Sequence, residues 1–335
     1  MYTIVLPIVL PLIGGYIVTS VVLLHFPTLL HRKKEIKFHC KHISHRGGAA
    51  ENLENTMTAY KHAVRTGTQM LEIDLQLTAD KQVVVCHDND LLRVAGVKQY
   101  VSELEYKDLP PLMERIPVQF HPGVVCEAKN NDRCIPLLET VLSEFPDMPI
   151  NIDIKFNSDE LIEKTNELIL KYKREHLCVW GNFNADVTQR CYNHNPNIPL
   201  LFSLKRCATL LLLFYTGLLP FVPLKESFLE IMLPKTMLRR FEVPRTMRAI
   251  CYIVDWLMIR PTLFQHLAKR GIQTFLWVLN EDDEFELAFE KLKVAGVMTD
   301  YPSKLSEYLE KQHGLTELGN EPLLANEQPQ YLDGK

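Results

Sequence analysis

Strand-like and helix-like segments alternate along the whole chain, and this alternation limits the possible folds more than any other feature. The strand patterns lie near residues 42–45, 70–76, 82–86, 150–155, 177–181, 199–204, 273–279 and 295–299. Helical patterns lie between most of them, at 55–66, 137–145, 159–174, 185–193, 262–270 and 282–291, and 303–311 follows the last strand. Alternating β and α elements in this number predict an α/β fold of the (β/α)8 TIM-barrel type. The 335 residues suffice for one barrel of about 250 residues with additions.

Acidic side chains recur on one face of two of these strands. In residues 71–76, Leu-Glu-Ile-Asp-Leu-Gln, apolar and polar residues alternate, so Glu72 and Asp74 share a face. Asp153 stands in a similar alternation at residues 151–156. Taken alone, a Glu-x-Asp pair is most often a solvated strand face. In a barrel, however, both faces of a strand are normally apolar, so inward-pointing acids require a cation or another partner.

Two histidines close strand-like segments, at the strand ends where a barrel of this type carries its active site. These are His45 and His87. Histidine titrates near neutral pH, so one ring can accept a proton while another donates one. An isolated histidine is more often structural or exposed, and His42 and His266 fit that reading. Together with the carboxylates, His45 and His87 indicate metal-assisted hydrolysis of a phosphate ester.

A series of short blocks gives the chain a resemblance to a known family. The blocks stand at residues 45–47, 54–56, 72–74, 84–88, 153–155, 277–280 and 296–302, and they span residues 42 to about 310. In this order they are similar to the glycerophosphodiester phosphodiesterase family. The long apolar N-terminus and the wording Glu-Asn-Leu-Glu-Asn-Thr at 51–56 resemble the membrane-anchored lysophospholipase D branch of that family.

The chain departs from the family pattern at three positions. Asp153 stands where many members have Glu, Lys81 where a turn glycine is common, and Ala95 where a threonine is usual. The departures concern the metal geometry and the choice of ion, because Asp is one methylene shorter than Glu.

The resemblance implies a TIM barrel with a small inserted subdomain and assigns a role to each candidate residue. One divalent cation, Mg²⁺ or Ca²⁺, would bind to carboxylate oxygens, which are the ligands that hard cations prefer. We expect its ligands to be Glu72, Asp74 and Asp153. His45 and His87 form the expected proton-transfer pair, with His87 as an alternative metal ligand.

Five further residues complete the predicted site. Arg46 and Lys155 would hold the phosphodiester anion, although each could instead pair with the acidic ligands. Glu54 and Asn55 would orient His45 or a ligand, with a helix N-cap as the other reading of Asn55. Trp277 would line the substrate pocket or, alternatively, serve as a core aromatic residue.

Residues 1–30 contain no Asp, Glu, Lys or Arg, and this run exceeds the roughly 20 residues that span a bilayer. The segment 31–41 that follows is basic. By the positive-inside rule we expect a transmembrane anchor over 1–30, with the catalytic domain, residues 42–311, in the cytosol. The alternative is a cleaved signal peptide, which would need a positive region before its apolar core. The polar tail 312–335 is expected to be disordered.

Two segments interrupt the barrel pattern. Residues 89–135 lack long periodicity and resemble the small capping subdomain of the family. Residues 205–250 combine an uncharged run, 207–224, with a basic stretch, which is typical of insertion at a membrane surface. A second transmembrane crossing would place the last two strands on the other side of the membrane, where they could not close the same barrel.

These observations favour a phosphodiesterase that cleaves lysophospholipids, such as those with choline, ethanolamine or N-acylethanolamine head groups, to lysophosphatidic acid. The alternatives are hydrolysis of deacylated glycerophosphodiesters and a catalytically inactive barrel that senses membrane lipids. The expected partners are the lysophospholipid and the bilayer of an intracellular membrane, either endoplasmic reticulum or perinuclear. A net charge of −4 argues against nucleic acid, and we expect no nucleotide cofactor.

Overall fold

The structure of the protein, a computed structural model, describes residues 2–318, and within its two terminal helices the side chains of residues 2–8 and 313–318 are not described. Seven parallel strands lie side by side in one sheet. Their order is β7 (Cys178–Gly181), β6 (Ile150–Ile154), β2 (Met70–Leu77), β1 (His42–Ser44), β10 (Gly296–Thr299), β9 (Gln273–Trp277) and β8 (Phe228–Met232). Parallel bridges from Leu200 to Trp180 and from Leu201 to Phe228 join the two edges. The fold is therefore a nearly closed TIM-like barrel, as the alternation predicted.

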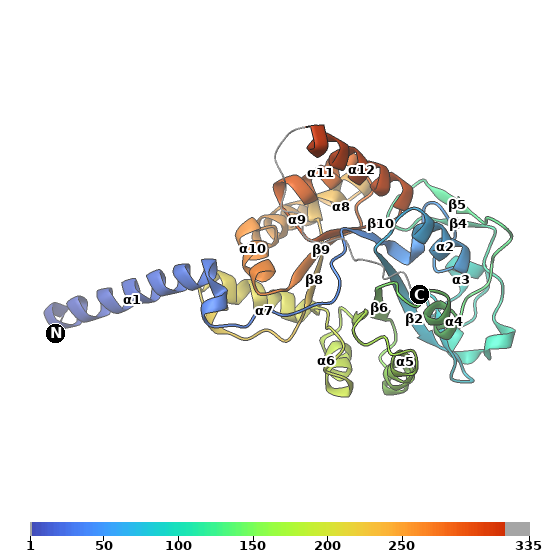
Figure 1. The fold of residues 1–335 in the computed structure, drawn as a ribbon, viewed down its shortest axis with the longest axis horizontal. Coiled ribbons are helices and arrows are strands. Elements are labelled where there is room, and N and C mark those ends of the chain that lie inside the picture. The colour runs from blue at the N-terminus through green and yellow to red at the C-terminus, as the bar shows by residue number, and fades with distance from the viewer. Residues whose placement is uncertain (1, 319–335) are drawn as a thin grey trace, which may run out of the picture.

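The helices lie outside the strands, as Figure 1 shows. Those that follow the barrel strands are α2 (Met57–Arg65), α4 (Leu138–Glu144), α5 (Asp159–Lys171), α6 (Ala185–His194), α7 (Leu204–Tyr215), α10 (Pro261–Lys269), α11 (Asp282–Glu286) and α12 (Pro302–Leu318). Between β8 and α10 the chain forms α8 (Pro234–Arg240) and α9 (Arg245–Met258). Side-chain oxygens cap several of these helices at their first free N–H groups, for example Thr56 at α2, Ser158 at α5 and Asn184 at α6.

The barrel interior changes from apolar to polar along the strands. Near the strand beginnings it is filled by buried side chains that pack in one cluster, including Met70, Phe228, Phe275 and Met298. Two residues further along the same faces stand Glu72, Glu230 and Asp300, and Trp277 follows Phe275, since alternate residues of a strand share a face. The apolar layer therefore closes the bottom of the barrel, and the polar side chains lie toward the carboxyl ends of the strands.

The strand prediction was wrong at two places. Residues 82–86 contain β3 (Val83–Val85), which pairs antiparallel with the end of β2 and is not one of the parallel barrel strands. The barrel strand that the prediction missed is β8, which lies in the predicted insertion 205–250 and follows the barrel helix α7. Phe-Leu-Glu-Ile-Met has one polar residue, so its period was not visible in the sequence. The membrane association of 205–250 is a separate matter and stays a prediction.

The segment 89–135 forms a small subdomain beside the barrel, on the side away from α1 in Figure 1. It contains α3 (Leu92–Ala95) and an antiparallel pair, β4 (Arg115–Pro117) and β5 (Val125–Glu127). A separate cluster of buried side chains stabilises it, among them Leu91, Leu112 and Cys126. This arrangement agrees with the small subdomain that the resemblance implies.

The first helix, α1 (Tyr2–His25), extends away from the barrel in Figure 1. Its second half contacts the loop after α7, where Tyr16 donates to the carbonyl of Thr216 (2.5 Å) and Ser20 donates to that of Gly217 (2.6 Å). Within the residues that the structure describes, no helix is both long and apolar enough to cross a membrane. The transmembrane anchor stays a prediction. At the other end, α12 continues to Leu318, beyond the expected boundary at 311, and residues 319–335 of the predicted tail lie outside the described residues.

Candidate active site

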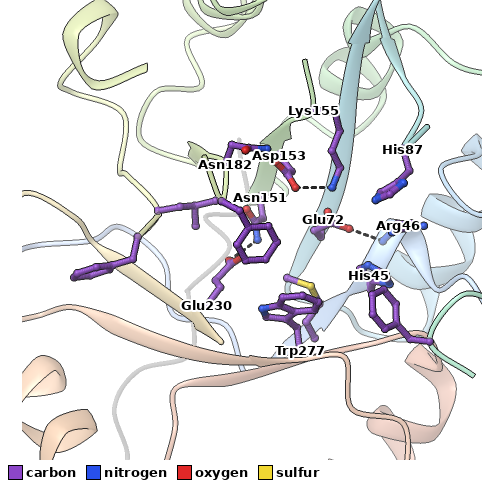
Figure 2. A pocket seen from close by; sticks show the side chains of 15 residues that line it. His45, Arg46, Glu72, His87, Asn151, Asp153, Lys155, Asn182, Glu230 and Trp277 are labelled. Carbon is purple, nitrogen blue, oxygen red and sulfur yellow. Dashed lines mark hydrogen bonds and ion pairs between the residues drawn. The ribbon is translucent and has the colours of Figure 1, made fainter. Parts of the chain in front are cut away.

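A pocket opens at the carboxyl ends of the strands and gathers most of the residues selected from the sequence (Figure 2). One side carries ionisable groups, which together with Asp74 we call the charged wall: His45, Arg46, Glu72, His87, Asp153 and Lys155 line the pocket, and Asp74 lies behind them in contact with Arg46 and Lys155. Facing it is an aromatic wall of Phe120, Phe183 and Trp277. Asn151, Asn182, Glu230 and Met298 line the rest, with Leu201 and Phe202. Residues from strands far apart in the sequence therefore meet in one cavity.

His45 follows β1 in a short helical turn, η2 (His45–Gly47), and is buried. Its Nδ1 lies 2.7 Å from a carboxylate oxygen of Asp300, just after β10. Asn280 in turn donates to the other oxygen of Asp300 (3.1 Å). Burial and then the Arg46 charge lower the pKa of His45, while Asp300 opposes this shift. The ring is therefore fixed through Nδ1, with Nε2 left for chemistry.

His87 is held in the same manner from another direction. Its Nδ1 lies 2.6 Å from Asp88, which also accepts from Arg93 Nε (2.5 Å). Burial acts to raise the pKa of Asp88, but the hydrogen bonds from His87 and Arg93 lower it to about 2. Both predicted histidines thus line one pocket, each with a carboxylate on Nδ1.

The three predicted metal ligands lie on neighbouring strands. In the pairing of β2 with β6, Asp74 stands opposite Asp153, and Glu72 stands opposite Asn151, one repeat nearer the bottom of the barrel. Glu72 accepts from the Arg46 backbone N–H (2.8 Å). Burial and then the Asp74 carboxylate raise the pKa of Glu72 well above its usual range. The positive charge near Glu72 is therefore too small to offset its burial and the charge of Asp74.

Arg46 and Lys155 line the same pocket but pair with the acids, as one reading of the sequence allowed. Lys155 Nζ lies 2.9 Å from Asp74 and 2.6 Å from Asp153. Arg46 Nε lies 3.2 Å from Asp74. Burial would raise the pKa of Asp74, but these two cations hold it well below its usual range.

Glu54 and Asn55 support this wall rather than His45. Glu54 accepts from Arg46 (3.0 Å) and from both terminal nitrogens of Arg93 (2.8 and 2.7 Å). Asn55 donates to Asp74 (2.9 Å) and accepts from the Tyr60 hydroxyl (2.7 Å). The N-cap reading of Asn55 was wrong, because Thr56 occupies that position.

Trp277 lies at the end of β9 and faces the cavity, so the pocket reading of this residue is confirmed by its position. Its ring centroid is 5.8 Å from that of Phe120, which comes from the subdomain, and 5.5 Å from that of Phe183. Phe120 also approaches His45, with ring centroids 5.5 Å apart. The aromatic wall therefore reaches His45.

Four polar residues of the site were not selected from the sequence. They are Asp300, which holds His45; Asn182, which donates to Asp153 (2.7 Å); and the hydrogen-bonded pair Asn151 and Glu230. Asp300 stands in the family block 296–302 and could have been chosen on that ground. Glu230 could not, because its strand was not identified.

The donor set fits a divalent cation in chemistry. Three carboxylates meet at one end of the barrel, and the raised pKa of Glu72 reports a shortage of positive charge that a cation would relieve. In the described part of the chain, however, no three His, Cys, Asp or Glu side chains are arranged as a metal site. Instead, the ammonium group of Lys155 contacts two of the three acids, Asp74 and Asp153.

Comparisons with known proteins agree with this geometry. The family model described as "Glycerophosphoryl diester phosphodiesterase family" matches residues 45–304. The human protein named lysophospholipase D GDPD1 is 51% identical over 300 residues, covering 89% of this chain and 95% of that protein. The human lysophospholipase D GDPD3 is 37% identical over 91% of this chain and 96% of its own length.

Solved structures support the fold. The glycerophosphoryl diester phosphodiesterase domain of a Mycobacterium tuberculosis protein matches 81% of this chain and 100% of its own, with a TM-score of 0.62 at 16% identity. A phosphodiesterase from Oleispira antarctica, in complex with the product sn-glycerol-3-phosphate, matches 82% of this chain and 98% of its own with a TM-score of 0.56 at 18% identity. The chain therefore belongs to the glycerophosphoryl diester phosphodiesterase family and is a phosphodiesterase.

Proposed function

We propose that this phosphodiesterase is a lysophospholipase D, which releases the head-group alcohol of a lysophospholipid and leaves lysophosphatidic acid. The observation that carries the proposal is the pair His45 and His87, both facing one pocket beside Arg46 and both held through Nδ1 by a carboxylate. Two rings fixed in this manner can serve as base and acid in one phosphoryl transfer. The substrate class is supported by the relatives named lysophospholipase D, which align along most of the chain.

The nucleophile in this proposal is the substrate's own 2-hydroxyl. Its oxygen attacks phosphorus, its proton passes to one histidine, and the other histidine protonates the oxygen of the departing alcohol as the P–O bond breaks. Water then opens the cyclic phosphate. An intramolecular attack gains up to roughly 7–11 kcal/mol over a bimolecular one in well-aligned systems. A diacyl phospholipid has no free 2-hydroxyl and cannot react by this route.

Glu72, Asp74 and Asp153 would hold a divalent cation, Mg²⁺ or Ca²⁺. When bound, it would supply positive charge to the phosphoryl oxygens. Lys155 would then exchange its contacts with Asp74 and Asp153 for the phosphodiester anion, because the cation would satisfy both acids. Arg46 can reach the same anion while Glu54 and Asn55 keep the surrounding side chains in place.

The test compares substrates that share one head group. Choline release is measured from lysophosphatidylcholine, from its 2-methoxy and 2-deoxy analogues, and from glycerophosphocholine. We expect fast release from the parent lysolipid and loss of at least about 100-fold for the analogues, since the intramolecular route is blocked. Equal rates for parent and analogues would make water the nucleophile. Activity confined to glycerophosphocholine would mean that the enzyme acts on deacylated diesters instead.

We further infer that the enzyme works on an intracellular membrane. Exposed apolar side chains follow α1, among them Val9, Leu12, Ile13 and Ile17. A second exposed set lies on α9, namely Met247, Ile250, Ile253 and Trp256. The ring of Trp256 stacks on Tyr215 at the end of α7, with centroids 6.5 Å apart, which joins α9 to the segment that α1 contacts.

Arginines accompany these apolar side chains. Arg245 and Arg248 are exposed on α9, and the Arg260 guanidinium lies 4.1 Å from the Trp256 ring centroid. Apolar and aromatic side chains beside arginines are the composition of membrane-surface helices. We expect a glycosylation tag to be modified at the N-terminus and to remain unmodified at the C-terminus. Modification of the C-terminal tag would contradict a cytosolic barrel.

A further inference from the structure

One carboxyl group at the bottom of the pocket has no part in the chemistry described so far. Glu230 is the third residue of β8 and lines the cavity, to the left of Trp277 in Figure 2. Its backbone stands opposite Phe275 in the pairing of β8 with β9, so Trp277 lies one strand repeat nearer the mouth. Asn151, with which it pairs, lies one repeat deeper than Asp153. Glu230 therefore belongs to the floor of the site.

The surroundings of Glu230 supply little positive charge. Its hydrogen-bond partner is a neutral amide, Asn151, which donates to it at 2.5 Å. The cations of the pocket are engaged elsewhere, Arg46 with Glu54 and Lys155 with Asp153. Among the described side chains, none forms an ion pair with Glu230. Burial and then the Asp153 charge raise the pKa of Glu230 to about 8. A carboxyl group with this pKa is largely protonated at neutral pH, and a positively charged ligand beside it would favour its charged form.

Aromatic rings complete the surroundings of this carboxyl group. Trp277 lies between the floor and the mouth, with Phe183 beside it at 5.5 Å between ring centroids. The faces of such rings attract ammonium groups, by about 0.5–1 kcal/mol at exposed sites and about 2 kcal/mol where water is excluded. A carboxylate below and aromatic rings above therefore form a site for an organic cation.

We propose that Glu230, with Asn151 and Trp277, binds the positively charged nitrogen of the head-group alcohol, as found in choline and ethanolamine. This inference rests on the proposed lysophospholipase D function and specifies its substrate class. The phosphate then stays beside His45 and Arg46, the nitrogen reaches the floor, and the acyl chain leaves through the mouth.

The first experiment removes the charge of Glu230 and keeps its shape. E230Q is compared with the native enzyme on lysophosphatidylcholine and lysophosphatidylglycerol with the same acyl chain, so that only the head-group charge differs. We expect kcat/KM to fall about tenfold or more for the choline substrate and to change less than about twofold for the glycerol substrate. The matched control is E127Q, which removes an exposed carboxylate on β5, far from the floor, and should leave both values unchanged.

The second experiment needs no variant and so does not depend on how E230Q folds. Choline and its neutral carbon isostere, 3,3-dimethylbutan-1-ol, are tested as inhibitors of the native enzyme. We expect choline to inhibit at concentrations at least about tenfold lower, because the two molecules differ in charge alone. Equal inhibition would overturn the proposal, as would an E230Q enzyme that loses both substrates equally or neither.

A separate arm keeps this inference distinct from the proposed function. If the native enzyme cleaves no lysolipid, the lysophospholipase D assignment fails. The same variant is then measured on glycerophosphocholine and glycerophosphoglycerol. Selective loss of the choline substrate would still support the ammonium site, whereas equal loss would reject it.

Discussion

The charged wall and the aromatic wall enclose one pocket, but they are built by different means. In the charged wall nearly every ionisable group touches one of opposite charge, as Arg46, Asp74 and Lys155 do. On the opposite side the rings of Phe120, Phe183 and Trp277 contact one another, and Glu230 is held by an amide. The charged wall therefore has its partners within the protein, while the other side has its charge available to a ligand. In the functions proposed above, the first side carries out catalysis and the second selects the substrate.

The largest loss of activity is expected when the acids of the charged wall are removed. We expect Glu72→Ala or Asp74→Ala to lower kcat by at least about 10²–10³-fold, and chelation of divalent cations to do the same to the native enzyme. Circular dichroism should show a folded barrel in both variants. Full activity in excess chelator would remove the metal from the proposed function. As a control, Asp283→Asn removes an exposed acid that pairs with Arg239.

A smaller loss is expected where the charged wall is held by the neighbouring strand β10. Asp300 holds His45 from the last strand, so Asp300→Asn leaves the ring in place but removes the carboxylate. We expect kcat to fall about 10–100-fold with KM nearly unchanged, as for other partners that orient a reactive group. A change confined to KM would assign Asp300 to substrate binding instead.

Two buried histidines that have no carboxylate partner should make the stability of the protein depend on pH, unlike His45 and His87, which a carboxylate holds. His42 and His266 are both buried, and burial lowers the pKa of each to about 4. Between pH 6.5 and 4 the unfolded chain therefore binds protons that the folded chain does not, so stability falls as the pH drops through this window. The free energy of unfolding, measured in urea at pH 7 and pH 5, should decrease by a few kcal/mol.

His42→Gln should reduce this acid-induced loss, whereas His194→Gln, at an exposed position, should not change it. The same pH dependence in all three proteins would mean that other groups cause the acid destabilisation.

The smallest expected effect comes from the residue in which the chain departs from its family. Asp153→Glu restores the longer side chain that many members carry, and Asn182 remains available to hold it. We expect activity within about threefold of the native enzyme but a changed ratio of activity with Mg²⁺ to activity with Ca²⁺, because the two ions differ in preferred distance. An unchanged ratio would show that this position does not select the ion.

The charged wall could be predicted from the sequence because its residues come in short blocks. Glu72 and Asp74 stand in one strand, His45 and Arg46 are adjacent, and Asp153 and Lys155 share another strand. Alternation along a strand places such pairs on one face, so local order nearly determines their neighbourhood. The partners of these residues were less predictable, since Glu54 and Asn55 were expected to orient His45 or a ligand: Asn55 donates to the predicted ligand Asp74, whereas Glu54 holds Arg46 and Arg93.

The sequence by itself determined the barrel class, the family and which residues are candidates for the reaction, because periodicity and short motifs are local properties. Only the tertiary structure decided which segment completes the barrel, and that β8 rather than residues 82–86 is a barrel strand. It also decided that Asp300 contacts His45, from which it is separated by 255 residues in the sequence, and that Glu230 lies on the pocket floor. Closure of a barrel brings the first and last strands together, and no local pattern records which side chains then face each other.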